Sequence, residues 1–412
     1  MQRRRVVVTG TGVISVLGDS RQALHDALCN GSSGIRPVEQ FADPILDNPL
    51  VAELTSFDPA NYLGQRNFRP LDRTSRLLAS TAQLALDDSG WTLEMREKSP
   101  VGLVAGTTFC SVHTISQFDR RALVEGPSCA SPLDFANTVI NAAAGQTAIW
   151  HKLEGVNSTI STGITSGIEA IAYAASLIGA GHERAVLAGG VEELCIESLL
   201  GFQRAGLLAK VNGSGAEPPV PFDSRANGFA LGEGAALLML EDFDAAQSRG
   251  ATTLAEVKGY ASSFDCSIGE RQTTCERRAA TIARSIRAAI AAATATCSID
   301  AVSVSANGNR FFDRSEALGI ERAFNGQSRS LPVTAQKSML GESLGASAAI
   351  QGVDMIETLR DGRLAGVRGF QLPDDSFPLR GVSAECRTTR PRNCLINSVG
   401  LDGHCCSLIL GL

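Results

Sequence analysis

The side chain that could decide the chemistry of this chain stands in a turn between a β-rich run and an alanine-rich helix. Residues 158–162 are β-rich, Gly163 opens a tight turn, and residues 167–179 are typical of a helix. Free N–H groups and the helix dipole favour an anion at such a helix start, so a cysteine there would be a strong nucleophile. The sequence has Ile164 there instead. A hydrocarbon side chain cannot attack a thioester or hold an acyl group.

The cysteines and histidines do not form a catalytic or metal-binding pattern. Eleven Cys and five His are scattered over 412 residues without a CxxC, HxH or HExxH spacing. We therefore expect reduced thiols and no zinc site. Two thiol–imidazole dyads can be drawn from nearby residues, but buried cysteines are usually inert, so we expect these to be core residues. The dyads are Cys110 with His113, and His404 with Cys405 or Cys406.

The elements that must position these residues alternate between strands and helices, which predicts a layered α/β fold. Predicted strands are β-branched runs at residues 6–8, 101–105, 158–161, 185–188, 235–240, 301–304 and 395–398. Predicted helices are Ala/Leu-rich stretches at residues 74–86, 167–179, 278–293 and 346–359. The length exceeds that of one ordinary core, and a strand–turn–helix unit recurs after residue 331. We expect two related halves, residues 1–245 and 246–412.

Composition excludes several classes of function. Thirty-seven basic and 43 acidic residues give a net charge of -6, without a sustained basic block, so no nucleic-acid partner is expected. Apolar runs fall short of a bilayer span and the first residues lack a signal-peptide core, which predicts a cytoplasmic protein without a membrane partner. The densest basic group is expected to be a solvated face, with contact to a carrier protein as the alternative. It comprises Arg66, Arg69, Arg73 and Arg76.

Three ordered segments carry a resemblance that runs nearly end to end. Residues 6–12 (VVVTGTG) open the chain, residues 187–192 read LAGGVE, and residues 221–235 read PFDSRANGFALGEGA. They resemble the opening strand, the "AGG.E" segment and the "PFD..R.GF..GEGA" signature of the β-ketoacyl synthase family of condensing enzymes. The resemblance implies the thiolase-like fold, an α/β fold with αβαβα layers and two related halves.

The resemblance also implies that all three chemical positions are replaced. Active members carry a cysteine in an "ST-x-C-x-SG" turn and one histidine in each of two further motifs. Those positions are Ile164, Asn307 and Glu342 in this sequence. In the family the two histidines donate to the developing enolate oxygen, and losing one such donor costs ~10²–10³ in rate. A carboxylate at position 342 would repel an enolate. We expect no condensation on this chain and no catalytic residue.

Charged residues around these positions are retained, namely Lys337, Glu316 and Asp313. They could be the remnant of a catalytic network. Buried charges usually pair, however, so we expect Lys337 to form a structural ion pair with Glu342 or Glu316. The family's closing loop is also eroded at residues 397–404, where both of its phenylalanines are replaced.

An inactive ketosynthase-like chain resembles the chain length factor, or ketosynthase β, of type II polyketide synthases. This class forms a heterodimer with an active ketosynthase, and the growing chain enters a tunnel at their interface. The resemblance implies three partners: that ketosynthase, an acyl carrier protein and a poly-β-ketoacyl chain. No cofactor is expected to bind, because the phosphopantetheine arm belongs to the carrier protein. The usual residue at the cysteine position is Gln, so Ile164 indicates a divergent branch that serves aryl polyenes or aromatic polyketides.

The resemblance places a tunnel gate after the turn at Gly106 and Thr107, with ordinary packing of an interface helix as the alternative. The predicted gate residues are Phe109, Val112 and Ile115, with His113 and Phe118 as neighbours. The dimer is expected to be mostly apolar and to pair one strand with its partner across a two-fold-like axis. The residues of that strand are Ser158, Thr159, Ile160 and Ser161.

Two other functions stay open from the sequence. The chain could be an acyl-carrier-protein-dependent decarboxylase or acyltransferase that uses displaced residues such as Asn307 and Lys337. It could also be a homodimeric acyl-binding or regulatory protein without a ketosynthase partner. Turnover of malonyl-carrier protein by this chain alone would favour the first, and a stable homodimer that ignores a ketosynthase would favour the second.

Overall fold

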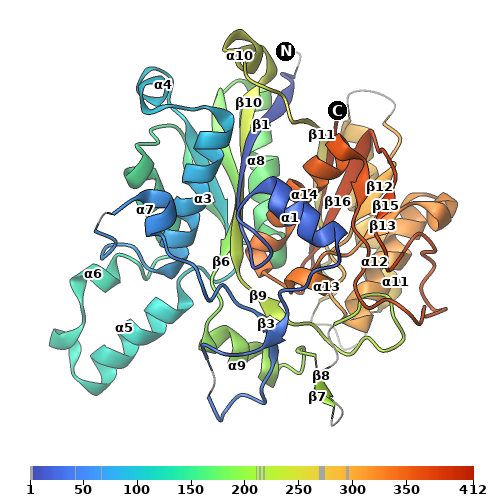
Figure 1. Ribbon diagram of the computed structural model, residues 1–412, viewed down its shortest axis with the longest axis horizontal. Coiled ribbons are helices and arrows are strands. Elements are labelled where there is room, and N and C mark those ends of the chain that lie inside the picture. The colour runs from blue at the N-terminus through green and yellow to red at the C-terminus, as the bar shows by residue number, and fades with distance from the viewer. Residues whose placement is uncertain are drawn as a thin grey trace.

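A ten-stranded sheet crosses the whole molecule in the computed structural model (Figure 1). The structure describes residues 3–412 except 42, 66, 210, 213–214, 217–218, 269–273 and 294–296, so Arg66 lies outside the described residues. The order across the sheet is β13 (Val333–Thr334), β12 (Ala301–Ser303), β16 (Asn393–Val399), β17 (His404–Gly411), β11 (Ala255–Phe264), β1 (Val6–Ile14), β10 (Gly234–Asp242), β6 (Ala185–Glu192), β4 (Gly102–Gly106) and β5 (Asn157–Ile160).

The sheet divides into two halves by chain order. Strands up to Asp242 form one half and strands from Ala255 form the other. The halves join through the antiparallel pair β1 and β11, where Val7 faces Glu256 and Val8 faces Ala255. Each half therefore presents one face to the middle of the molecule and one face outward.

Helices fill three layers around these two half-sheets (Figure 1). The middle layer holds α8 (Ser166–Ala180) and α14 (Ser347–Asp361), whose apolar side chains pack with those of both half-sheets in one buried cluster. One outer layer holds α3 (Arg73–Ser89) and α7 (Ala142–His151), and the other holds α11 (Cys275–Ala292) and α12 (Arg310–Ala323). The predicted thiolase-like αβαβα layering is confirmed.

The two central helices repeat one local design, which confirms the two related halves. Each spans 15 residues and follows a three-residue 3₁₀ turn, η2 (Gly163–Thr165) or η4 (Leu344–Ala346). The first residue is a serine in both, and its Oγ accepts a backbone N–H at 2.9 Å in one turn and 2.8 Å in the other. Each helix ends at a left-handed glycine, Gly181 or Gly362, where only a residue without Cβ avoids strain.

The segment Gly163–Ala180 is long and apolar enough to span a membrane, although the sequence predicted no such run. Isoleucine and alanine residues raise its mean hydropathy, but polar residues interrupt them, so no long aliphatic run is formed. Two thirds of it, 67%, is buried inside the protein. Its apolarity is therefore explained by its place as a central helix between two half-sheets, which cover most of its surface.

Shorter elements surround this core and carry the loops of the site. The remaining helices are α1 (Arg21–Cys29), α2 (Ala60–Leu63), α4 (Leu93–Lys98), α5 (Val112–Val124), α6 (Pro132–Phe135), α9 (Ile196–Arg204), α10 (Phe243–Ser248) and α13 (Lys337–Leu340), with 3₁₀ turns η1 (Pro127–Cys129) and η3 (Gln327–Ser330). The remaining strands are β2 (Arg36–Pro37), β3 (Leu50–Ala52), β7 (Val211–Asn212), β8 (Gly215–Ala216), β9 (Leu231–Gly232), β14 (Arg363–Leu364) and β15 (Arg387–Thr388). Helices α5 and α6 extend away from the layered body (Figure 1).

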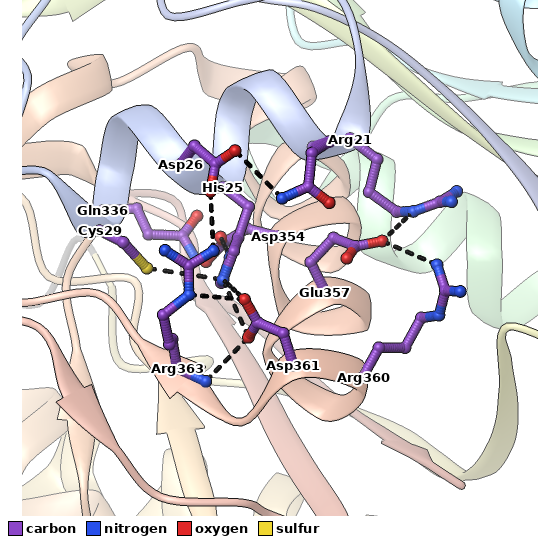
Figure 2. A network of polar contacts seen from close by, with 11 residues as sticks. Arg21, His25, Asp26, Cys29, Gln336, Asp354, Glu357, Arg360, Asp361 and Arg363 are labelled. Atoms are coloured by element: carbon purple, nitrogen blue, oxygen red, sulfur yellow. Dashed lines mark hydrogen bonds and ion pairs between the residues drawn. The ribbon is translucent and has the colours of Figure 1, made fainter.

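A buried imidazole fastens α1 to the central helix α14 (Figure 2). His25 is fully buried; its Nδ1 lies 2.6 Å from Asp354 and its Nε2 lies 3.1 Å from Asp361. Burial alone would lower the pKa of His25, but the two carboxylates outweigh it and raise that pKa. Gln336, directly before α13, donates to the other oxygen of Asp354 at 2.5 Å. The network therefore links the central layer to the loop that carries Lys337.

Candidate functional site

The turn that begins α8 holds Ile164 inside the protein. Ile164 is 3% exposed and lies in the 3₁₀ turn η2. Gly163 adopts a φ of +64°, which a glycine tolerates, and Ser166 Oγ donates to the Gly163 carbonyl at 2.6 Å. The side chain of Ile164 packs in an apolar cluster with Val51, Leu199, Phe229, Leu231 and Leu344. A packed hydrocarbon group thus occupies the position at which the resemblance implies a nucleophile in active members.

The two other replaced positions touch each other. Asn307 lies in the loop between β12 and α12, and Glu342 follows α13. Asn307 Nδ2 donates to Glu342 Oε2 at 2.9 Å, although 35 residues separate the two in the chain. Both are buried, at 4% and 0% exposure. The structure therefore brings these two predicted site residues into direct contact.

Lys337 completes this contact with a buried ion pair. Its Nζ lies 2.8 Å from Glu342 Oε2 and 3.2 Å from Ser305 Oγ. The second oxygen of Glu342 accepts from Leu344 N at 3.1 Å and from Ser347 Oγ at 2.8 Å. Of the two partners expected for Lys337, Glu342 is the one in contact. A buried charge pair with further hydrogen bonds to its surroundings serves to hold loops together.

Glu316 and Asp313 bind backbone and amide groups instead of the lysine. Glu316 Oε1 accepts from Ser305 N at 2.9 Å and from Asn397 Nδ2 at 2.6 Å. Asp313 accepts from Asn307 N at 3.0 Å, which fixes the loop that carries Asn307. Burial raises the pKa of each carboxyl group to about 7. Both residues therefore hold the loops of the site in place.

Ile164 joins this group through its neighbours. Leu344, two residues after Glu342, packs in the same apolar cluster as Ile164. On the other side, Ser398 Oγ donates to the Ile164 carbonyl at 3.4 Å, and the next residue, Val399, donates its N–H to Ser305 Oγ at 3.1 Å. The turn, the Glu342 loop and the closing loop thus form one packed site.

This arrangement has little capacity for acyl chemistry. The replaced turn offers no ionisable side chain, and the Asn307 amide N–H points to Glu342. The Asn307 Oδ1 atom accepts from Asn309 N at 3.2 Å. Lys337 donates to Glu342 and Ser305. Groups that could stabilise an enolate are engaged within the site, and the nearest carboxylate would repel one.

The first alternative dyad is not formed. Cys110 is 1% exposed, and burial raises the pKa of its thiol to about 11. His113 instead turns its Nδ1 to Glu197, at 3.1 Å. The thiol therefore stays protonated in the core near neutral pH, as expected for a structural cysteine.

The second alternative dyad is not formed either. His404 Nδ1 lies 3.1 Å from Asp402 Oδ2. Cys405 and Cys406 are both fully buried in β17, and burial raises the pKa of each thiol to about 12. They belong to two different apolar clusters on opposite faces of the sheet, so neither acts with the imidazole.

The predicted gate residues line the connection from β4 into α5. Phe109 is 40% exposed, and its ring meets that of Phe202 edge-on at 6.1 Å between centroids. Phe202 in turn meets Phe229 at 5.6 Å, and Phe229 packs in the cluster of Ile164. An aromatic series therefore leads from Phe109 to the replaced turn. Farther along α5, partly buried side chains follow at Val112, His113, Ile115 and Phe118.

The predicted dimer strand is an edge of the sheet. Among the residues that the structure describes, β4 is the one strand that pairs with β5, and Ser158, Thr159 and Ile160 are half-buried. Ser161 lies just past the end of this strand and is exposed, so the strand is one residue shorter at that end than predicted. An unpaired edge is a template for pairing with another chain.

Exposed apolar side chains gather in the chain segment that leads to this edge. Half of the large apolar side chains exposed in the described part of the chain lie between residues 123 and 149, on α5 to α7. They are Leu123, Val124, Leu133, Phe135, Val139, Ile140 and Ile149, at 46–85% exposure. Such a concentration marks a surface that a partner covers.

One prediction about the arginines is wrong. The sequence places Arg73 on a solvated face, yet its guanidinium holds both oxygens of the buried Glu233 at 2.8 Å. Glu233 also accepts from Leu54 N at 2.7 Å, so this pair secures the loop before α3. A bidentate pair with a buried carboxylate is structural. Arg69 is exposed, as predicted.

The fold agrees with matches to a known family. Residues 3–246 match the N-terminal domain and residues 254–371 the C-terminal domain of β-ketoacyl synthase. The chain belongs to the β-ketoacyl synthase family. It is 30% identical to 3-oxoacyl-[acyl-carrier-protein] synthase 2 of Coxiella burnetii, over 100% of this chain and 99% of that protein.

Relatives from polyketide synthesis are nearly as similar. The actinorhodin polyketide putative β-ketoacyl synthase 1 of Streptomyces coelicolor is 28% identical, over 99% of this chain and 88% of that protein. Among solved structures, the ishigamide ketosynthase/chain length factor superposes with a TM-score of 0.90 and 28% identity, over 99% of both chains. A β-ketoacyl synthase from Burkholderia phymatum gives a TM-score of 0.90 and 27% identity, also over 99% of both chains.

Proposed function

We propose that this chain is a catalytically inactive chain length factor, which pairs with an active ketosynthase and shapes the tunnel for a growing polyketide. The observation that carries the proposal is the filled turn: Ile164 is packed where a nucleophile would stand. The contact of Asn307 with Glu342 supports it, because the second and third chemical positions are engaged with each other.

Two features support a heterodimer. The free edge of β5 and the exposed apolar side chains on α5 to α7 would be covered by a partner of the same fold. The ishigamide ketosynthase/chain length factor is a structural neighbour over the full length of this chain. We propose that Ser158, Thr159 and Ile160 pair with the same strand of the active ketosynthase.

The tunnel would end at Phe109, Val112 and Ile115. Phe109 lies between β4 and α5, and Val112 and Ile115 lie in the first turns of α5, the helix that extends away from the layered body (Figure 1). The substrate is then a poly-β-ketoacyl chain carried on the phosphopantetheine arm of an acyl carrier protein, and the chemistry belongs to the partner's cysteine. The division at residues 245 and 246 and a cytoplasmic location are part of the same proposal.

The experiment is reconstitution with an active ketosynthase, a carrier protein and malonyl units. We expect a one-to-one complex whose activity is lost when the partner's nucleophilic cysteine is replaced and retained when Ile164→Ala is introduced here. Replacing Phe109, Val112 or Ile115 by alanine is expected to lengthen the product. Turnover of malonyl-carrier protein by this chain alone would sink the proposal, and a homodimer that ignores the ketosynthase would favour an acyl-binding role.

A further inference from the structure

The gate segment, residues 107–118, is held in place by four carboxylates from three other parts of the chain. We call this group the acidic clamp. Its members are Asp72 directly before α3, Glu192 at the end of β6, Glu193 in the next position, and Glu197 in the first turn of α9.

Glu192 fixes the start of the gate segment. It is 1% exposed, and it accepts from Thr108 N at 2.7 Å and from Phe109 N at 2.8 Å. It also accepts from Gly345 N at 3.1 Å, three residues after Glu342. The parallel pairing of β4 with β6 brings these groups to one sheet edge. One carboxyl group therefore ties the backbone at Phe109 to the loop of the replaced site.

Glu193 fixes the first turn of α5. It is 5% exposed and accepts from His113 N at 3.2 Å. The residue before the helix, Ser111, makes no side-chain cap, so this helix start relies on the carboxyl group of Glu193, one residue past the end of β6. The direction of α5, and with it Val112 and Ile115, follows from this contact.

Two weaker contacts hold the same turn from the sides. Glu197 Oε2 lies 3.1 Å from His113 Nδ1 and joins α5 to α9. Asp72 caps α3 through Ser75 N at 2.9 Å and also accepts from Thr114 Oγ1 at 3.4 Å. Backbone, imidazole and hydroxyl groups of one helical turn therefore all face acids.

This grouping is electrostatically costly, which argues that it serves a purpose. Burial raises the pKa of Glu192 to about 7, and burial together with the charge of Asp72 raises that of Glu193 to about 8. Apolar residues of similar volume would fold at lower cost. Carboxyl groups, unlike apolar ones, fix a backbone by direction as well as by volume.

We propose that the acidic clamp sets the position of the gate segment, so that Glu193 and Glu197 are positioning residues for product length. The inference rests on the proposed function. The gate side chains would then limit the length of the polyketide, and the acidic clamp would set their position without contacting the polyketide.

The test measures product lengths from the reconstituted complex for Glu193→Ala, Glu193→Gln, Glu197→Ala and a matched control. The control is Glu53→Ala, because Glu53 is also buried and accepts two backbone N–H groups, from Glu39 and Gln40, away from the gate. We expect Glu193→Ala and Glu197→Ala to change the ratio of the two main product lengths about tenfold, as loss of a hydrogen bond that anchors the gate segment implies. Glu193→Gln keeps an acceptor oxygen and should give the same product ratio as the parent protein. Glu53→Ala should also leave the product ratio unchanged.

Two results overturn the inference. One is an unchanged ratio for both clamp variants in complexes where Ile115→Ala does shift the product. The other is an equal shift from Glu53→Ala. If the Glu193→Ala variant fails to assemble into the complex, the Glu197→Ala variant tests the inference instead. The Glu197 side chain is 22% exposed, so its removal is less disruptive to folding. Failure of the proposed function looks different: the alanine variants at Phe109, Val112 and Ile115 would then leave product length unchanged as well.

Discussion

The ammonium group of Lys337 lies 2.8 Å from a carboxylate oxygen of Glu342, and both side chains are almost completely buried. This pair stands at the centre of the replaced site, because Asn307 binds the same oxygen. Removing one partner would leave the other charge without compensation inside the protein.

We expect Glu342→Leu and Lys337→Met each to destabilise the fold by about 3–5 kcal/mol, whereas the double variant recovers most of that loss. Denaturant unfolding of the four proteins gives the coupling energy. The matched control is the exposed pair Glu94–Lys98, where Lys98→Ala should cost at most ~0.5 kcal/mol. If the losses in unfolding free energy of the Lys337→Met and Glu342→Leu variants were additive in the double variant, this result would contradict a structural ion pair.

Restoring a thiol alone should not restore condensation. In Ile164→Cys the new side chain would stand at the start of α8, but position 307 would still present an amide bound to Glu342. We expect no turnover of malonyl-carrier protein when this variant is combined with a partner that lacks its own cysteine. The readouts are product formation and protein mass. An acyl group that attaches at position 164 of the variant and goes on to product would show that the remaining groups suffice.

Stability is expected to fall as pH rises from about 5 to 8. Burial raises the pKa of Glu192, Asp313 and Glu316 to about 7 and, with the charge of Asp72, that of Glu193 to about 8, so the folded chain holds protons that the unfolded chain has released. Each such group contributes a slope of up to about 1.4 kcal/mol per pH unit. The raised pKa of His25 acts in the same direction, since its stabilisation is complete below about pH 6.5 and is lost above its folded pKa.

Urea midpoints at pH 5.5 and pH 8.5 test this dependence, and Glu193→Gln provides the control because it removes one titrating group. The variant should lose less stability between the two pH values than the parent protein. A parent protein that is equally stable at both would contradict the assignment of neutral carboxyl groups to the folded state.

Complex formation should depend on the exposed apolar residues of α6 and α7. Ile149 is 76% exposed, so Ile149→Arg should change the stability of the isolated chain by no more than ~0.5 kcal/mol. The same change should weaken binding to the ketosynthase at least tenfold, because a charge would be buried at the interface. Leu93→Arg on α4, at 42% exposure, is the control. Equal binding by both variants, measured by size-exclusion chromatography and calorimetry, would place the interface elsewhere.

Regular elements with strong local patterns could be predicted from the sequence. All seven predicted strands and all four predicted helices are present, with ends that differ by a few residues. Strand β17 was missed, because its sequence HCCSLILG has few β-branched residues, and burial on both faces rather than alternation makes it a strand. The amphipathic helix α12 is not among the predicted helices either.

The site was predictable as a set of replaced positions but not as a set of contacts. That the three chemical residues are replaced is what the resemblance to the family motifs implies, whereas the hydrogen bond between Asn307 and Glu342 joins two loops across 35 residues. The role of Glu192 and Glu193 was also missed. Only the pairing of β6 with β4 brings them to the gate segment, and that neighbour relation is not encoded in any local pattern.

The repeated turn before each central helix has a consequence for where a side chain can stand. Counting back two residues from the serine that begins each helix leads to Ile164 in one half and Gly345 in the other. A Cβ on Gly345 would lie 2.7 Å from the Cα of Thr107, so that copy has no room for any side chain. The two turns are therefore not interchangeable. Only the turn in the first half has space for a side chain, so any group that is to stand at the start of a central helix has to be at residue 164.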